Sequence, residues 1–247
     1  MTYCVGLMVN EGLVFLSDTR TNAGVDNIAR YRKMFTWTTP GERALVLMTA
    51  GNLATSQAVL SLITEGIEAE AAGVETGDET LPSILTAPSM FRTAEIIGEA
   101  MVMVQNKYRR AFEQMSNGNS GATMILGGQR QGGAPRLFLI YPEGNFIEAA
   151  EDTPFLQIGE HKYGKPILDR VITMQTPLAE ARKAALLSMD STLRSNLSVG
   201  MPLDLTVLPR DAYAFSEQTR IEPEDAGFRQ LSDAWSTALR DAFQTIS

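Results

Sequence analysis

The order in which strand-like and helix-like segments follow one another is the feature that most restricts the fold of this chain. Four short segments rich in Val, Leu, Phe and Tyr come first, and two segments with apolar residues at helical spacing follow. Further strands, a third helix, a last strand and a closing helix complete the chain. Strands that come in blocks, rather than alternating with helices, predict antiparallel sheets. We therefore expect an α/β (α+β) fold, a four-layer αββα sandwich of two antiparallel sheets between helix layers.

The expected strands are short apolar runs bounded by turn residues, and they comprise residues 2–9, 13–17, 33–37, 43–49, 122–127, 136–141, 145–148 and 203–208. The expected helices have apolar residues three or four positions apart. The first of them carries Leu53, Val59 and Ile63, and the others span residues 91–115, 177–197 and 223–243. Residues 73–90 lack periodicity and predict a loop, and the pairs Gly127-Gly128 and Gly132-Gly133 are interpreted as turns.

The size and charge of the chain narrow the classes of function. Its 247 residues suffice for a complete core, so we expect a single domain, with the core at about residues 2–210 and a helical extension at about residues 222–247. The 21 Lys and Arg residues stand against 29 Asp and Glu residues, which gives a formal net charge of −8. Because polyanions are bound by clustered Lys and Arg, this balance argues against nucleic-acid partners and against an anionic membrane surface.

Cysteine and histidine are too rare for several kinds of site. Cys4 and His161 are single residues of their types, so a disulfide framework and a thiolate or histidine metal cluster are excluded, and we expect no metal and no cofactor. Cys4 is interpreted as a core residue and His161 as a surface residue. No apolar run approaches the roughly 20 residues of a membrane span, and residues 1–10 lack the charged start of a secretory signal. A cytoplasmic location is therefore expected.

The second residue has the chemistry of a self-contained nucleophile. Removal of Met1, which is common before a small residue, would leave Thr2 with a hydroxyl and a free α-amine. The amine, whose ordinary pKa is about 8, can accept the hydroxyl proton, so this nucleophile needs no histidine. A Thr at position 2 also occurs by chance in many proteins, and that alternative stays open on this residue alone.

Two charged residues are expected at the same end of the sheet as Thr2. In a hairpin of residues 2–9 and 13–18, Asp18 returns to the side of Thr2, and a third strand that begins at Lys33 can start at the same end. An ammonium beside a hydroxyl lowers the pKa of that hydroxyl, and a carboxylate keeps the ammonium in place. The alternative interpretation is an ordinary surface ion pair, which contributes little to stability.

These residues and their surroundings resemble a known family. The segments TYCVG, GLVFLSDTR, RKMF and LVLMTAG, followed by Ser120-Gly121-Ala122 and by Asp204-Leu205, are similar to the β-type subunits of proteasomes, which are N-terminal nucleophile hydrolases. The resemblance extends over about residues 2–210. It implies a Thr2 nucleophile with Asp18 and Lys33 as its charged partners, and an oxyanion hole formed by the backbone N–H of Gly51.

The second half most resembles one branch of that family, the bacterial Anbu or ancestral β-subunit proteins. The segments IGEHKYGKPILD and SMDSTLRSNLSVG carry this likeness. Proteasome β subunits have a Ser where this chain has Glu160 and an Asp where it has Ser195, whereas Ser198 keeps the position of a later active-site Ser. Such supporting groups orient a nucleophile and set its pKa. The two replacements are therefore expected to alter the rate of the reaction and the range of substrates.

The resemblance implies a threonine hydrolase of amide bonds, in peptides or unfolded proteins, that is activated by the removal of Met1. Two alternatives remain open, a small-molecule amidohydrolase on the same fold and an assembly subunit with little or no activity. A homo-oligomer is also expected, because the last helix carries a broad apolar stripe beyond the core. The sequence does not distinguish a closed ring from an open spiral, and it specifies no ATPase partner. The stripe consists of Phe228, Leu231, Trp235, Leu239 and Phe243.

Overall fold

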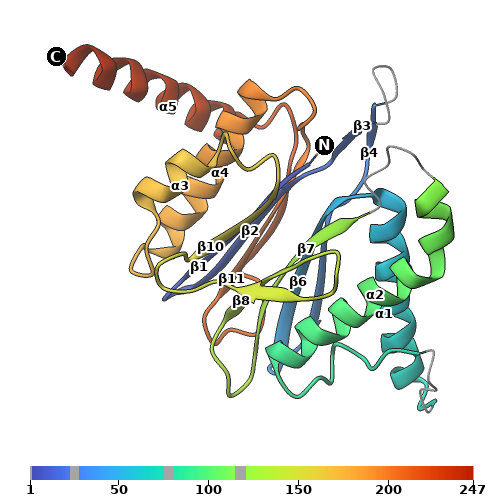
Figure 1. The fold of residues 1–247 in the computed structure, drawn as a ribbon. Helices are drawn as coiled ribbons and strands as arrows, with labels where there is room; N and C mark the ends of the chain where they lie inside the picture. Colours follow the sequence, from blue (N-terminus) through green and yellow to red (C-terminus); the bar gives the residue numbers. More distant parts are fainter. Residues whose placement is uncertain (1, 23–27, 75–79, 115–120, 247) are drawn as a thin grey trace.

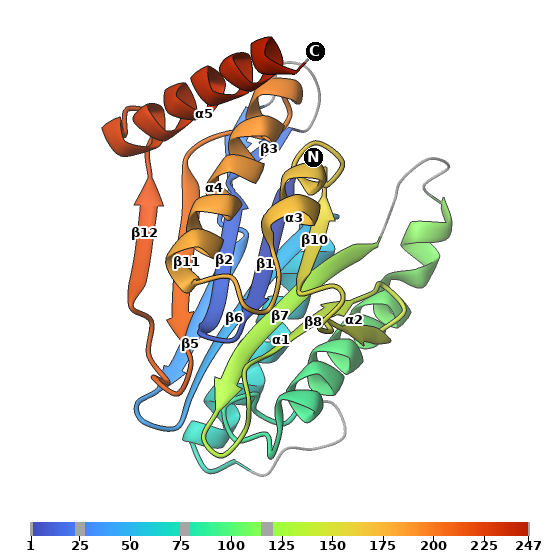
Figure 2. The ribbon, with the colours of Figure 1, turned by 90° about the vertical axis from the view of Figure 1, so that its left-hand side faces the viewer.

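Two five-stranded antiparallel sheets face each other in the computed structural model, which describes residues 2–22, 28–74, 80–114 and 121–246. Two helices, α1 and α2, lie on the outer side of one sheet, and two others, α3 and α4, lie on the outer side of the other (Figure 1). Seen from the side, the last helix, α5, crosses over α4 at one end of the molecule (Figure 2). The layers confirm the expected four-layer sandwich.

The first sheet contains the start of the chain. Its strands pair in the order β10, β1, β2, β11 and β12, and every pair is antiparallel. The hairpin expected from the sequence is present as β1 and β2. The bounds of the strands are β1 (Tyr3–Val9), β2 (Gly12–Asp18), β10 (Phe155–Gly159), β11 (Leu203–Pro209) and β12 (Glu217–Ile221).

The second sheet has its strands in sequence order, and a short ribbon of β3 and β4 joins the two sheets along the chain. The strands are β3 (Arg20–Asn22), β4 (Ile28–Arg30), β5 (Met34–Thr39), β6 (Arg43–Gly51), β7 (Ala122–Arg130), β8 (Arg136–Ile140) and β9 (Phe146–Glu148). The helices are α1 (Leu53–Ala71), α2 (Met90–Gln114), α3 (Lys165–Val171), α4 (Leu178–Ser195) and α5 (Ala226–Thr245). Their bounds confirm the four expected helices to within a few residues, and the expected end at Met115 lies outside the described residues.

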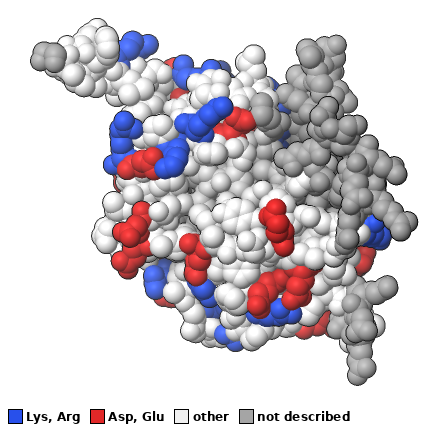
Figure 3. Space-filling view, in the orientation of Figure 1, with Lys and Arg blue, Asp and Glu red and all other residues white. Residues whose placement is uncertain are grey.

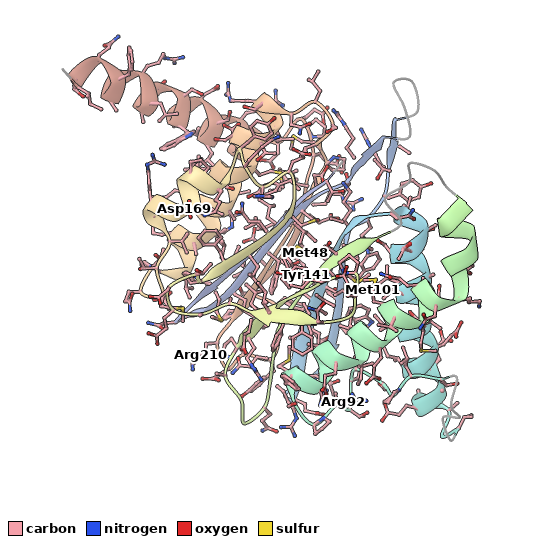
Figure 4. All side chains as sticks on the ribbon, viewed as in Figure 1. Met48, Arg92, Met101, Tyr141, Asp169 and Arg210 are labelled. Atoms are coloured by element: carbon pink, nitrogen blue, oxygen red, sulfur yellow. The ribbon has the colours of Figure 1, made fainter. Side chains whose placement is uncertain are left out.

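The inner strands are buried on both faces, which explains why their sequences are continuous apolar runs. Successive side chains of a strand point to opposite faces. In β1, Tyr3, Val5 and Leu7 pack against α3 and α4, whereas Cys4 lies in the core between the sheets. Figure 4 places Met48 of β6 in this inner region and Arg92, Asp169 and Arg210 at the periphery. No helix among the described residues is long and apolar enough to cross a lipid bilayer.

The pair Gly127-Gly128 lies inside β7, so its interpretation as a turn is wrong. A Cβ at Gly127 would lie 2.5 Å from the ring of Phe15 on the facing sheet, and a Cβ at Gly128 would overlap the carbonyl oxygen of Ala44. Gly127 therefore allows close packing of the two sheets, and Gly128 allows close packing of β7 on β6 within one sheet, so neither glycine serves chain reversal. By contrast, Gly132 does form a turn, with a φ of +79°.

Several elements were not predicted because they lack a local pattern. Strand β12 is polar and largely exposed, and α3 has only seven residues, which is too short for helical periodicity to show. Strand β10 is also short, and it is recognisable only by its pairing with β1. Strand β10 and helix α3 lie beside the chain start, whereas β12 is the edge strand on the other side of the sheet.

Candidate active site

Thr2 stands directly before β1 and is held through its backbone carbonyl. The N–H of Glu160 donates to the Thr2 carbonyl oxygen at 2.7 Å. The preceding Gly159 has a φ of +81°, and a Cβ there would overlap that same oxygen, so only glycine allows the end of β10 to approach the chain start. Thr2 is only 9% exposed, so the start of the chain is buried against the rest of the fold.

Asp18 and Lys33 form a buried ion pair beside the chain start. Lys33 Nζ lies 2.7 Å from Asp18 Oδ1, and the two side chains are 6% and 0% exposed. Lys33 Nζ also donates to the carbonyl oxygen of Arg20 at 2.6 Å. The N–H of Tyr3 donates to the same Asp18 Oδ1 at 3.1 Å, so the ion pair is one residue from Thr2 along the chain. The interpretation of this pair as an ordinary surface pair is therefore wrong.

The hairpin and the next strand account for this arrangement. Leu203 of β11 pairs with Asp18, and the N–H of Gly200, just before β11, donates to Asp18 Oδ2 at 3.1 Å. Burial raises the pKa of the Asp18 carboxyl, while the Lys33 ammonium and the N–H groups of Tyr3 and Gly200 oppose that rise. Both carboxylate oxygens are therefore occupied, and the carboxylate is fixed in one orientation.

Gly51 ends β6 at the same end of the sandwich. The N–H of Thr49 donates to the carbonyl oxygen of Lys33 at 2.9 Å, which places the last residues of β6 beside Lys33. Gly51 has a φ of +102°, and a Cβ there would lie 2.5 Å from the carbonyl oxygen of Gly121. A glycine is therefore required where the chain turns from β6 towards α1, whose first turn is capped by the Asn52 side chain.

Ser198 lies in the loop that reaches Asp18, but its own bonds are local. Its N–H donates to Asn196 Oδ1 at 3.0 Å, and its hydroxyl donates to the same oxygen. The contact of this loop with Asp18 is made by the backbone of Gly200. Arg20 covers the loop, because its Nη1 donates to the carbonyl oxygen of Leu197 at 2.8 Å.

Glu160 and Ser195, the two positions that differ from proteasome β subunits, lie in different parts of the structure. Glu160 contributes its N–H to Thr2, and its carboxylate is 4.0 Å from Lys162 Nζ. Ser195 is exposed at the end of α4. The neighbouring Arg194 bonds Asp190 and Ser232, so it belongs to the contact between α4 and α5.

The other candidate residues behave as expected. Cys4 is fully buried, and burial raises the pKa of its thiol, which keeps it a neutral core group. His161 is exposed. Arg20, Gly200 and Tyr3 are parts of this site that the sequence did not predict. The Gly200 backbone and the Arg20 side chain carry no local signal, since each acts through a contact more than 170 positions away along the chain.

Solved structures show what this chain is similar to. The Anbu (Gly-1) mutant from Hyphomicrobium sp. strain MC1 is 53% identical with a TM-score of 0.89, and the match covers 100% of this chain and 98% of that chain. A helical assembly of the Anbu complex from Pseudomonas aeruginosa is 47% identical, and Anbu from Yersinia bercovieri is 43% identical. Each of these two has a TM-score of 0.88 and covers 99% of this chain and 97% of its own.

Comparison with protein-family models and with curated proteins gives no match. The solved structures nevertheless agree in fold and are alike in sequence over nearly the whole chain. The chain therefore belongs to the Anbu, or ancestral β-subunit, family of proteasome-like proteins.

Proposed function

We propose that this chain is a threonine-type hydrolase that cleaves amide bonds in peptides, with Thr2 as its nucleophile once Met1 has been removed. The observation that carries the proposal is the buried pair of Lys33 and Asp18, whose carboxylate also accepts the N–H of Tyr3. Buried ion pairs contribute little net stability, because desolvation offsets their attraction. A charged pair retained in this place is typical of a functional site.

In the proposed mechanism, the Thr2 hydroxyl attacks the carbonyl carbon of the amide, and its proton passes to the α-amine, directly or through one water. The N–H of Gly51 donates to the oxyanion of the tetrahedral intermediate. The C–N bond then breaks, the leaving amine takes the proton, and an ester joins the acyl group to Thr2. Water attacks this ester with the α-amine as base, which releases the acid and restores the hydroxyl.

The charged pair has a separate task in this mechanism. The Lys33 ammonium lowers the pKa of the Thr2 hydroxyl by favouring its deprotonated form. Asp18 holds that ammonium in place, and the N–H of Gly200 holds the second oxygen of Asp18. We assign Ser198 a supporting part, as a member of the loop that carries Gly200.

We also propose that the chain works as a homo-oligomer and that residues 222–247 are an extension that binds a second copy. The first half of α5 packs on α4 through Phe228 and Leu231. The second half projects from the body, and its end is mostly uncharged on the face drawn in Figure 3. Leu239 and Phe243 are 50% and 82% exposed there. The Pseudomonas aeruginosa relative, described as a helical assembly, supports association of such chains.

Three measurements on the purified protein test the hydrolase. Intact mass should show loss of Met1, a β-lactone that reacts with N-terminal Thr should add one adduct on Thr2, and fluorogenic peptides should be hydrolysed. Hydrolysis of amino-acid amides but not of peptides would replace the proposal with a small-molecule amidohydrolase. If Met1 is retained and no adduct forms, the result would favour the alternative of an assembly subunit with little or no activity. The cytoplasmic location remains a prediction, which cell fractionation tests.

A further inference from the structure

Tyr3, the residue after Thr2, is held by hydrogen bonds at both its backbone and its side chain. Its N–H bonds Asp18, as described above, and its ring is fully buried. Its hydroxyl oxygen lies 2.5 Å from Ser188 Oγ on α4 and 2.6 Å from Gln157 Nε2 on β10. An amide nitrogen can only donate, so the phenol accepts from Gln157, and in the bond between Tyr3 and Ser188 either hydroxyl can be the donor.

A glycine provides the space for this network. Helix α3 begins after Gly164, and a Cβ at Gly164 would overlap Ser188 Oγ and lie 2.7 Å from the Tyr3 hydroxyl. Burial raises the pKa of Tyr3 to about 12, so the phenol stays neutral near pH 7 and acts as a hydrogen-bonding anchor rather than as an acid or base. The end of β10, the start of α3 and the middle of α4 thus meet at one phenolic oxygen.

The start of the chain has a particular need for such an anchor. The ladder between β1 and β2 begins at the pair Cys4 and Ser17, so Tyr3 and Thr2 extend beyond it. Chain ends fray unless they are tied to the rest of the fold. On the side of β2, the backbone N–H of Tyr3 donates to the Asp18 side chain, because Tyr3 has no paired residue in that strand. On the side of β10, Tyr3 pairs with Gly159, and the Thr2 carbonyl oxygen accepts from Glu160. The phenol adds a contact with α4, on the outer face of the sheet.

We propose that Tyr3 is a positioning residue, whose phenol anchors the chain start to α4 and β10 and thereby holds Thr2 in place relative to Asp18 and Lys33. This inference rests on the proposed function, because it assigns a role in the reaction of Thr2. A displacement of a reacting group by about 1 Å can lower a rate about a hundred-fold.

The test compares Tyr3→Phe and Ser188→Ala with wild type. The rate of Thr2 acylation by a β-lactone is followed by intact mass, and kcat and KM are measured with a fluorogenic peptide. We expect acylation and kcat to fall about ten-fold to a hundred-fold in Tyr3→Phe, and less in Ser188→Ala, with KM little changed. A loss of general stability alone would not separate kcat from KM in this way.

Two control variants distinguish the anchor from simple loss of a hydroxyl or of stability. Tyr141→Phe removes a hydroxyl from a half-buried ring that packs against the core between the sheets (Figure 4). Val14→Ala weakens the core beneath the hairpin opposite Leu7, several residues from Thr2. Both should keep the wild-type acylation rate, whereas equal losses in Val14→Ala and Tyr3→Phe would overturn the proposal.

An unchanged acylation rate in Tyr3→Phe would also overturn it. If wild type itself is not acylated, the hydrolase proposal fails, and crystal structures of wild type and Tyr3→Phe still decide the anchor. We then expect the separation between the residue-3 nitrogen and Asp18 Oδ1 to increase from 3.1 Å to beyond hydrogen-bonding range. An unchanged separation would refute the anchor independently of any activity.

Discussion

Asp18 is the residue on which the contacts of the candidate site converge. It accepts from the Lys33 ammonium and from two backbone N–H groups, those of Tyr3 and Gly200. These donors come from three segments that are distant along the chain. At the residue scale, the site is therefore a buried carboxylate that fixes the start of the chain, a lysine and a loop relative to one another.

Replacement of Thr2 by Ala should abolish hydrolysis. The change removes one hydroxyl, leaves the backbone bond to Glu160 intact, and should preserve fold and assembly. Loss of a covalent nucleophile usually lowers kcat by a factor of about a thousand or more. Steady-state kinetics would measure it, with Thr64→Ala on the exposed surface of α1 as the matched control. Residual activity well above that level in Thr2→Ala would rule out Thr2 as the nucleophile.

Replacement of Lys33 by Ala should harm both stability and activity. It leaves Asp18 buried without its charged partner, which costs about 3–5 kcal/mol of unfolding free energy. Lys33→Arg should not restore activity, because the planar guanidinium cannot occupy the position of the compact ammonium. Denaturant unfolding and peptide hydrolysis measure the two effects.

The control for this change is an exposed lysine pair. Lys165 and Asp169 are each 47% exposed, so Lys165→Ala should change the unfolding free energy by less than about 1 kcal/mol. An active Lys33→Arg variant would show that Lys33 serves only as an ion-pair partner.

At the scale of elements, the close approach of the two sheets depends on β7. This strand lies against the facing sheet where Gly127 meets the ring of Phe15. A side chain at this position cannot be accommodated unless the ring or the strand moves. Gly127 therefore allows the close approach of the two sheets, and with it the relative position of Thr2, directly before β1, and Gly51, at the end of β6.

Gly127→Ala should lower the unfolding free energy by about 1–3 kcal/mol, as overpacking of a core does. Gly133→Ala, in the next turn, is the matched control. The nearest heavy atom to its new Cβ would be the Arg130 carbonyl oxygen at an ordinary 3.5 Å, so a change within about 0.5 kcal/mol is expected. Chemical denaturation of both variants would check this, and equal stability of the two would contradict the packing role of Gly127.

At the scale of the whole molecule, α5 is poorly covered by the rest of the described chain, and Phe228 is its one buried residue. The Ser232 hydroxyl donates to Asp190 and holds the first half of α5 on α4. In the second half, the apolar side chains of Leu239 and Phe243 are exposed in the described structure. Monomeric proteins rarely expose a continuous apolar stripe of this kind.

The double change Leu239→Asp and Phe243→Asp should dissociate the oligomer. It places two charges in the stripe that we assign to the contact with a second copy, and desolvation of those charges opposes binding. Light scattering at micromolar concentration should show a mass near 27.0 kDa for this variant and a larger mass for wild type. Thr237→Asp adds a charge elsewhere on the same helix and should leave the assembly intact. A monomeric wild-type protein would refute the homo-oligomer.

The hairpin explains why the charged pair of the site could be predicted from sequence. Its Gly-containing turn and its length determine that Asp18 returns to the chain start, and such local geometry is encoded by neighbouring residues. The order of strands and helices likewise predicted the two antiparallel sheets and the helices on their outer faces. The placement of Cys4 in the core and of His161 at the surface followed from the residue types and their neighbours.

The tertiary structure alone decided the rest, because it brings together groups with no local relation. Gly200 reaches Asp18 across 182 positions, and Ser188 reaches the Tyr3 phenol across 185 positions. The pair Gly127-Gly128 reads as a turn in the sequence, and only the ring of Phe15 on the facing sheet shows why a strand needs glycine there. The sequence by itself determined most of the elements and the charged pair beside Thr2, since these depend on neighbours along the chain. The supporting contacts were decided by packing, since hydrogen bonds and steric overlap depend on distance in space.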